Sequence, residues 1–387
     1  MSEISPQERE ILDWLAAQRA PMEALLADLV NTDSGSYNKA GVDRAGDVIC
    51  RFLDAHGIAC DVIPNDKFGN AIRANVGVGE RTVLLMGHRD TVYPDGEAAR
   101  RPYRSDGARG YGPGVADMKA GLVMNCFVAT ALRKFGAPAP VVVLVTADEE
   151  IGSPSSRALI EQEAKRSRLV LNAEPGRPDN AVVTGRKAGI FIRFAVAGKA
   201  AHAGANFEQG VSAIAEMAHK IVALHALTDL KKGVTVNVGV VSGGQTVNTV
   251  APFAKGETDL RYIDPADREA TLAKVEAIMA RSTVPGTSAT FNIYAEFLPL
   301  VQTAGSKRLF ELYADCGHAL GQSVAGIFTG GCSDAGFSAG AGAPTLCAVG
   351  PVGSRTHSPD EYVELSSLVP RAQALALTIL RSGAQFS

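Results

Sequence analysis

The most constraining feature of the sequence is an apolar run that ends in three consecutive acidic residues. Residues 141–146 (VVVLVT) have the β-branched composition of a buried strand, and Asp148, Glu149 and Glu150 follow almost at once. In parallel α/β sheets, ligands bind in the crevice at the carboxyl ends of the strands. Because adjacent carboxylates repel one another, we expect a positive charge to hold these three together. Alone, the stretch is equally typical of a solvated acidic turn.

A second apolar run, residues 82–86, ends in a histidine and an aspartate, His88 and Asp90. In an extended segment these two side chains point the same way, because side-chain direction repeats every two residues. A histidine can then bind a metal while the aspartate fixes its tautomer. Alone, a histidine near a strand end is more typical of a structural residue.

Three more segments place a candidate ligand after an apolar run or a flexible loop. Residues 169–171 lead into Glu174, and the last expected strand, residues 344–349, leads into His357. A glycine-rich loop at residues 110–114 precedes Asp117 and a helix expected at about 120–135, and its glycines let the backbone approach closely. The recurrence of this pattern favours a site over unrelated turns.

The candidate ligands are therefore two histidines and three or four carboxylates, without a thiolate. This combination suits zinc or a similar divalent ion in a hydrolytic site better than a structural metal cage. With one bridging carboxylate, the set divides into two metal sites that each keep an open position.

Composition excludes several other classes of protein. A chain of 387 residues with 46% hydrophobic residues predicts a large core and two domains. The net charge of -3, without a run of lysine and arginine, argues against a nucleic-acid partner. The six cysteines form no C-x-x-C pair, the N-terminus lacks a signal-peptide pattern, and no apolar run is expected to span a membrane. We therefore expect a soluble cytoplasmic protein with no membrane partner.

The alternation of strands and helices predicts an α/β fold with an insertion. Between residues 185 and 297 the order becomes strand, helix, strand, strand, helix, strand, with its first helix expected at 208–227. This order is that of a ferredoxin-like α+β domain. It interrupts a mostly parallel-sheet catalytic domain made of residues 1–184 and 298–387.

Six motifs together resemble the zinc aminoacylase/carboxypeptidase family, which includes glutamate carboxypeptidases, acetylornithine deacetylases and succinyl-diaminopimelate desuccinylases. They are HRDTV (88–92), GPGVADMKAG (112–121), ADEEIGS (147–153), NAEPG (172–176), GKAAHAG (198–204) and the HSPDEYV segment that begins at His357. The motifs follow the family's order over nearly the whole chain. They are most similar to bacterial glutamate carboxypeptidases of the folate-cleaving type.

The resemblance implies a role for each candidate ligand. Asp117 bridges two zinc ions, for which Co²⁺ or Mn²⁺ are expected substitutes. His88 and Glu174 complete the shell of one ion, and Glu150 and His357 complete that of the other. Asp90 orients His88, Glu149 is the general base, and a cis peptide bond follows Asp117.

The resemblance also assigns roles in the insert, which is expected to be a lid and the contact of a homodimer. His202 and Asn248 polarise the scissile carbonyl, and Arg261 binds the free carboxylate of the substrate, as a guanidinium fork can. Gly330 and Gly331 belong to a turn that lines the substrate pocket. Gly336 stands where some relatives have an arginine for a second acidic group, so the substrate stays open.

The expected reaction is hydrolysis of the amide bond to a C-terminal amino acid in a small peptide or N-acyl amino acid. Deacylation of N-acyl amino acids and dipeptide cleavage are alternatives within the family. A serine hydrolase is a remote alternative, because GFSAG at 336–340 matches G-x-S-x-G but lacks the strand that a nucleophile elbow needs. A non-catalytic binding protein is expected to lack the base, yet Glu149 is present.

Overall fold

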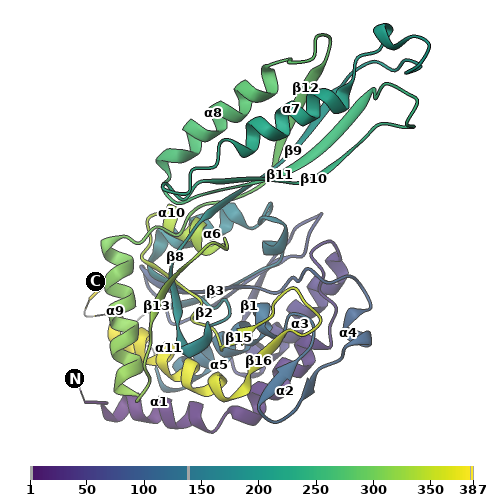
Figure 1. Ribbon diagram of the computed structural model, residues 1–387. Helices are drawn as coiled ribbons and strands as arrows, with labels where there is room; N and C mark the ends of the chain where they lie inside the picture. Colours follow the sequence, from purple (N-terminus) through teal and green to yellow (C-terminus); the bar gives the residue numbers. More distant parts are fainter. Residues whose placement is uncertain (1–2, 137–139, 384, 387) are drawn as a thin grey trace. The chain divides into compact units, whose positions relative to one another are not determined.

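The computed structural model describes residues 3–136, 140–383 and 385–386 (Figure 1). The chain forms two compact units. The larger unit comprises Met1–Gly185, Gln302–Thr329 and Ser333–Ser387, and the smaller comprises Arg186–Val301 with Gly330–Cys332. The insert predicted at 185–297 lies almost entirely in the smaller unit.

The larger unit is built on an eight-stranded sheet. Its strands, in spatial order, are β1 (Cys60–Ile63), β2 (Ala71–Val76), β6 (Val141–Thr146), β3 (Thr82–His88), β7 (Ser167–Asn172), β14 (Thr345–Cys347), β8 (Val182–Arg186) and β13 (Gly326–Thr329). The four central strands, β6, β3, β7 and β14, are parallel, and antiparallel strands flank them. The near-continuous apolar sequence of β6 and β3 reflects burial on both faces. The predicted mostly parallel sheet is confirmed.

The strand register brings the candidate ligands to one edge of this sheet. In the pairing of β3 with β6, His88 lies opposite Thr146, and in the pairing with β7, Met86 lies opposite Asn172. The segments after these three strands therefore leave the sheet side by side. Because these neighbouring strands run in the same direction, residues that are distant in sequence meet at this edge.

Helices pack against this sheet and against one another. They are α1 (Pro6–Ala16), α2 (Arg19–Val30), α3 (Lys39–Ala55), α4 (Glu97–Arg100), α5 (Ala120–Phe135), α6 (Arg157–Arg166), α9 (Ala304–Ala319), α10 (Ala335–Gly340) and α11 (Leu368–Ser382). The central helix is α5, whose residues from Ala120 to Leu132 are all buried. At its start, a Cβ on Gly121 would lie 1.9 Å from the carbonyl oxygen of Ala173, so only glycine lets the helix approach the segment that carries Glu174.

We expected no apolar run with the length and composition of a membrane-spanning helix, and this expectation was wrong. The helical segment Val115–Phe135 is long and apolar enough to do so. However, 94% of its most apolar 18-residue window is buried inside the protein. Its hydrophobicity is explained by its place in the core, where an all-round apolar helix is expected.

A small sheet in the larger unit was not predicted from the sequence. It has the order β15 (Gly353–Ser354), β16 (Tyr362–Glu364), β5 (Arg109–Tyr111) and β4 (Arg104–Ser105). The loop after β5 carries Asp117, and the loop between β15 and β16 carries His357. Pairing of β16 with β5 therefore holds these two loops together.

The smaller unit has the βαββαβ order predicted for the insert. Its elements are β9 (Ala188–Ala197), α7 (Ala213–His225), β10 (Thr235–Gly243), β11 (Phe253–Tyr262), α8 (Ala266–Ala280) and β12 (Ser288–Phe297). The antiparallel sheet has the order β10-β11-β9-β12. Helix α7 begins later than the predicted Glu208, because the Ser212 side chain caps it by accepting a hydrogen bond from the Ala215 N–H.

Candidate metal centre and substrate-contact residues

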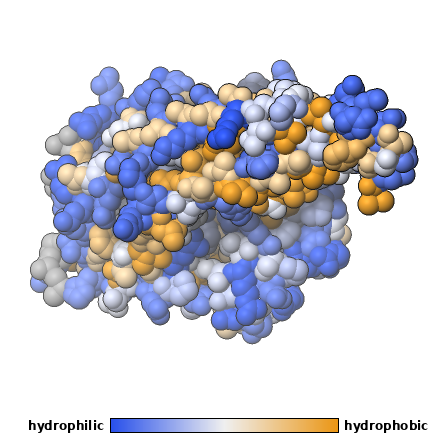
Figure 2. Space-filling view, turned by 45° about the horizontal axis from the view of Figure 1, so that its top comes forward, coloured by the Kyte–Doolittle hydropathy of each residue, from blue (hydrophilic) through white to orange (hydrophobic). Residues whose placement is uncertain are grey.

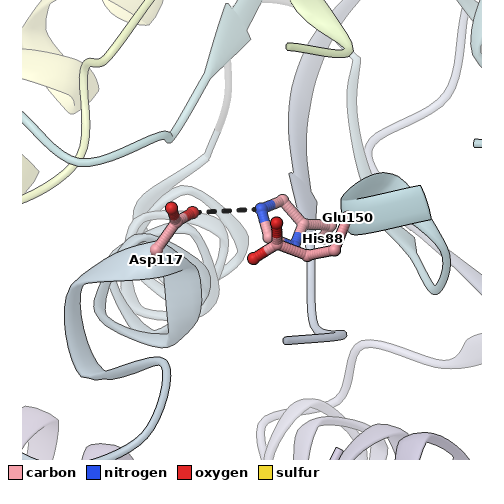
Figure 3. Close-up of side chains that lie close together, drawn as sticks. All are labelled: His88, Asp117 and Glu150. Atoms are coloured by element: carbon pink, nitrogen blue, oxygen red, sulfur yellow. Dashed lines mark hydrogen bonds and ion pairs between the residues drawn. The ribbon is translucent and has the colours of Figure 1, made fainter. Parts of the chain in front are cut away.

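Three side chains from different elements face one another at the carboxyl edge of the large sheet (Figure 3). His88 ends β3, Asp117 lies in the turn Val115–Lys119 before α5, and Glu150 lies in the 3₁₀ turn Glu149–Ile151 after β6. One ligand atom from each lies within 4.8 Å of the other two. The His88 Nε2 atom is 3.2 Å from Asp117 Oδ1.

Two further predicted ligands join this group. The His357 Nε2 atom lies 3.4 Å from Asp117 Oδ2 and 3.2 Å from Glu150 Oε2. Glu174 Oε1 lies 3.8 Å from His88 Nε2. The two carboxylate oxygens of Asp117 therefore face different histidines. The expected cis peptide bond between Asp117 and Met118 is also present.

Asp90 fixes the orientation of His88 from behind. The His88 Nδ1 atom is 3.0 Å from the Asp90 carbonyl oxygen and 3.4 Å from its carboxylate, so Nδ1–H donates to Asp90 and the other ring nitrogen, Nε2, faces the group. The buried Asp90 carboxylate also accepts hydrogen bonds from the Ser36 hydroxyl and from the backbone N–H groups of Glu149 and Glu150. One aspartate thus connects β3 to the acidic loop after β6.

The acidic side chains carry a local excess of negative charge. Burial, followed by the nearby Asp117 carboxylate, raises the pKa of Glu150 to about 7. The pKa of Glu149 is raised well above its ordinary value, chiefly by burial, with the carboxylates of Glu174 and Asp334 adding to the effect. The pKa of His357 is raised to about 10 by its contacts with Asp117 and then Glu150.

This chemistry fits divalent cations. A cation would favour the charged carboxylates and oppose the rise in their pKa. The described residues that converge here offer imidazole nitrogens and carboxylate oxygens, without cysteine sulfur, as a catalytic zinc or similar ion prefers.

Of the three consecutive acids, only two turn toward this group. Glu149 Oε2 lies 3.9 Å from His88 Nε2, beside Glu150. The Asp148 carboxylate instead accepts hydrogen bonds from the backbone N–H and the hydroxyl of Ser155 and from the Ser156 hydroxyl, just before α6. Asp148 therefore fixes the loop, and only Glu149 and Glu150 face the position where a cation was expected beside the three acids.

Glu361 supports the Asp117 loop and was missed in the sequence. Its fully buried carboxylate accepts hydrogen bonds from the backbone N–H groups of Gly114, Ala116 and Asp117, at 3.1, 2.9 and 3.0 Å. It also accepts one from the Tyr93 hydroxyl at 2.7 Å. In the sequence, Glu361 could have been noticed as an acidic residue within the HSPDEYV segment, directly before β16.

Asp334 supports the other side of the acidic loop. Its buried carboxylate accepts hydrogen bonds from the hydroxyls of Ser153 and Thr146. Its pKa is raised to about 7, mainly by burial. Asp334 therefore holds in place the segment that carries Glu149 and Glu150.

The smaller unit places His202 beside Asn248. The backbone of Ala203 donates a hydrogen bond to the Asn248 carbonyl oxygen at 2.9 Å, and His202 is bridged to Thr249. The His202 Nδ1 atom accepts hydrogen bonds from the N–H groups of Gly204 and Ala205, at 3.2 and 3.1 Å. Because Nδ1 is an acceptor, neutral His202 presents Nε2–H as its donor.

Arg261 lies in a second group within the smaller unit. Its guanidinium binds the Asp259 carboxylate through two hydrogen bonds, at 2.7 and 2.8 Å, and contacts the Cys332 sulfur at 3.0 Å. Gly330 and Gly331 directly precede this cysteine, and Arg186 donates to the Gly331 carbonyl oxygen at 3.2 Å. The predicted substrate-contact residues thus form two groups, His202 with Asn248, and Arg261 with residues 330–332.

The serine-hydrolase alternative is not compatible with the structure. Ser338 lies inside helix α10, is fully buried, and hydrogen-bonds to the Ala335 carbonyl oxygen and the Thr345 hydroxyl. A nucleophile elbow instead exposes its serine on a turn between a strand and a helix.

We predict that Glu361→Ala weakens metal binding by about 10 to 100-fold, because it frees the loop that positions Asp117. The loss of an acceptor for three buried donors should also reduce the free energy of unfolding by about 3 kcal/mol. Metal content after dialysis against a chelating buffer and denaturant unfolding measure the two effects. Glu364→Ala, in the strand that directly follows Glu361, is the matched control, and equal losses in both variants would contradict the role of Glu361.

We also predict a pH-dependent effect of Asp334 in the metal-free protein. A carboxyl group whose pKa is higher in the folded than in the unfolded state stabilises the fold at low pH, and this contribution is lost as the pH rises toward 7. When the pH rises from 4 to 7, the free energy of unfolding should therefore fall less for Asp334→Asn than for the wild type, by on the order of 3 kcal/mol. Unfolding in denaturant at each pH measures the difference. The exposed Asp66→Asn is the control, and parallel pH curves for the wild type and Asp334→Asn would disprove the linkage.

Comparison with known proteins agrees with this site. Carboxypeptidase G2 of Pseudomonas sp. (strain RS-16) is 30% identical over 374 residues, which cover 93% of this chain and 88% of that protein. An acetylornithine deacetylase of Myxococcus xanthus is 31% identical over 278 residues, covering 65% of this chain and 70% of that protein. The solved structure of an M20 family metallo-carboxypeptidase from Sulfolobus solfataricus shares the fold, with a TM-score of 0.78 at 17% identity, over 93% of this chain and 98% of that one. The family model for Peptidase family M20/M25/M40 matches residues 84–381. The protein therefore belongs to Peptidase family M20/M25/M40 and, as predicted, is a metal-dependent hydrolase.

Proposed function

We propose that this protein is a dinuclear zinc hydrolase that cleaves the amide bond to a C-terminal amino acid, as a glutamate carboxypeptidase does. The observation that carries the proposal is the position of Asp117 between two histidines. Its Oδ1 faces His88, near Glu174, and its Oδ2 faces His357, near Glu150. Each side of the bridging carboxylate thus has one imidazole and one further carboxylate.

In this proposal His88, Asp117 and Glu174 hold one ion, and Asp117, Glu150 and His357 hold the other. Such a metal pair lowers the pKa of a water molecule and polarises the substrate carbonyl when it is bound. Asp90 keeps the lone pair of His88 Nε2 directed at the site. Co²⁺ and Mn²⁺ present similar charge to the same donors and are the proposed substitutes.

Glu149 is the proposed general base. It is buried next to the ligands, and its elevated pKa suits a group that must both accept and release a proton. Its carboxylate takes a proton from the attacking water as the new C–O bond forms. The resulting carboxylic acid gives that proton to the amide nitrogen as the C–N bond breaks, which releases the free amine and restores the carboxylate.

The proposed substrate contacts come from the smaller unit, which would act as a lid. His202 Nε2–H and the Asn248 amide would donate hydrogen bonds to the carbonyl oxygen as negative charge develops there. Arg261 would bind the free carboxylate of the substrate, with Asp259 holding the guanidinium in place and Gly330 and Gly331 lining the pocket. Loss of this contact in Arg261→Met should appear mainly as a higher KM.

An N-acyl-amino-acid deacylase or a dipeptidase is the second candidate function. The similarity to a protein named acetylornithine deacetylase favours keeping it, because both reactions hydrolyse an amide through the same bond chemistry. A screen of dipeptides and N-acyl amino acids with zinc or cobalt added separates the two candidates by the preferred leaving group.

We further propose that the protein is a cytoplasmic homodimer that associates through the smaller unit. Figure 2 shows hydrophobic side chains exposed among hydrophilic ones at the surface. In the smaller unit, edge strand β10 exposes Val240 and Val241, and the adjacent helix α7 exposes Ile214 and Val222. Exposed apolar side chains along an open sheet edge favour pairing with another chain. A monomeric mass in sedimentation analysis at micromolar concentration would argue against this assembly.

Two substitutions of neighbouring glutamates test the assigned roles. Glu149→Gln should keep its metal content and lose at least about a hundredfold in kcat, because the amide cannot accept the proton. Glu150→Gln should instead lower the metal content. Metal analysis and turnover assays on the same samples separate the two effects. An active Glu149→Gln variant would mean that another group is the base.

A further inference from the structure

Arg371, in helix α11, is a fully buried cation that has no part in the proposed reaction. Its guanidinium donates hydrogen bonds to the Tyr313 hydroxyl at 3.4 Å and to the Ala181 carbonyl oxygen at 3.0 Å. Within the described ranges of the chain, no carboxylate forms an ion pair with it, and its Nε atom forms no hydrogen bond. Burying a charge in this way is unfavourable, and an apolar side chain of similar size would suit the position better if packing were its only role.

The guanidinium lies against the loop that carries Glu174. This loop runs from the end of β7 at Asn172 to Ala181, directly before β8, so the Ala181 hydrogen bond attaches its last residue to α11. A Cβ on Gly176 would lie 2.8 Å from Arg371 Nη2 and 3.1 Å from its Cζ, so the guanidinium fills the space that a side chain at residue 176 would take. Arg371 therefore contacts the loop at two places beyond Glu174.

The first part of the same loop is fixed by backbone pairing with the segment after β14. The Gly350 N–H donates to the Glu174 carbonyl oxygen at 3.0 Å, and the Gly176 N–H donates to the Pro351 carbonyl oxygen at 2.9 Å. These bonds continue the parallel pairing of β7 with β14 beyond the ends of both strands. Backbone pairing thus fixes the loop up to Gly176, and from there to Ala181 the loop lies on the Arg371 guanidinium.

We propose that Arg371 is a positioning residue for the metal centre, which keeps the Glu174 carboxylate beside His88 by holding the backbone of the loop at Gly176 and Ala181. The inference rests on the proposed function, in which Glu174 and His88 belong to one of two metal ions. The separation to be maintained is the 3.8 Å between Glu174 Oε1 and His88 Nε2.

The other proposed ion depends on a different set of contacts. His357 lies in the loop between β15 and β16, and this loop is held by the pairing of β16 with β15 and with β5. The hydrogen bonds of Arg371 go to Tyr313 and Ala181 instead. Loss of the guanidinium should therefore weaken the ion beside Glu174 and leave the ion beside His357 in place.

The test replaces Arg371 with methionine, which removes the charge and both hydrogen bonds but keeps a long side chain. In Arg371→Met, the affinity for one of the two ions should fall about 10 to 100-fold, as it does when a contact behind a metal ligand is lost. The denaturant midpoint of the metal-free protein should not fall, because apolar replacement of a poorly paired buried charge is often neutral or stabilising. Titration with Co²⁺, followed by visible absorption and metal analysis, gives the number of ions and their affinities.

Arg381→Met is the matched control. Arg381 lies in the same helix but forms an ion pair with Glu8, at 2.7 Å. Its loss should leave the binding of both Co²⁺ ions unchanged.

A second comparison tests whether Arg371 acts through Glu174. Glu174→Gln alone should weaken the same ion, and adding Arg371→Met to it should cause no further loss of Co²⁺ affinity, because the carboxylate to be positioned is already absent. Losses that add in the double variant would mean that Arg371 acts by another route and would overturn the inference.

The remaining outcomes separate this inference from the proposed function. If the wild type binds two Co²⁺ ions and Arg371→Met binds both equally well, or loses both together with its stability, Arg371 has a structural role only and the proposed function stands. If the wild type itself binds fewer than two ions at saturating Co²⁺, the dinuclear proposal fails and the inference fails with it.

Discussion

The Asp117 carboxylate, shared between two histidines, is the contact on which the rest of the site depends. It links the His88 side to the His357 side, with separations of 3.2 Å to His88 and 3.4 Å to His357. Its pKa is lowered because the hydrogen bonds from these histidines outweigh burial, the largest single effect, which acts in the opposite direction. A charged carboxylate is thus maintained in a buried place. Two interactions hold Asp117 in this position. The Glu361 carboxylate accepts hydrogen bonds from the backbone of the Asp117 loop, and the pairing of β5 with β16 brings that loop next to His357.

The large sheet supplies the other half of the site through strand order. Strands β6, β3 and β7 are adjacent and parallel, although the chain visits them in the order β3, β6, β7. Each therefore delivers its next residues to the same edge, and His88, Glu149 with Glu150, and Glu174 meet without any long loop. Gathering acids in this way is unfavourable without a cation, which is why burial and mutual repulsion raise the pKa of Glu149 and Glu150. Asp90 and Asp334 hold the acidic loop in place despite this repulsion.

Much of this arrangement could be predicted from the sequence, and each failure has a physical cause. His88 and Glu174 were identifiable because each follows an apolar run in an expected parallel strand, whose direction fixes the edge to which they are carried. The small sheet was missed because strands such as β15 and β16 have only two or three residues, too few for a hydrophobic period. Its absence from the prediction also hid Glu361. The direction in which the Asp148 side chain points was not predictable either. Neighbouring acids in a turn differ only in the hydrogen-bond donors that lie near them, and for Asp148 these are Ser155 and Ser156.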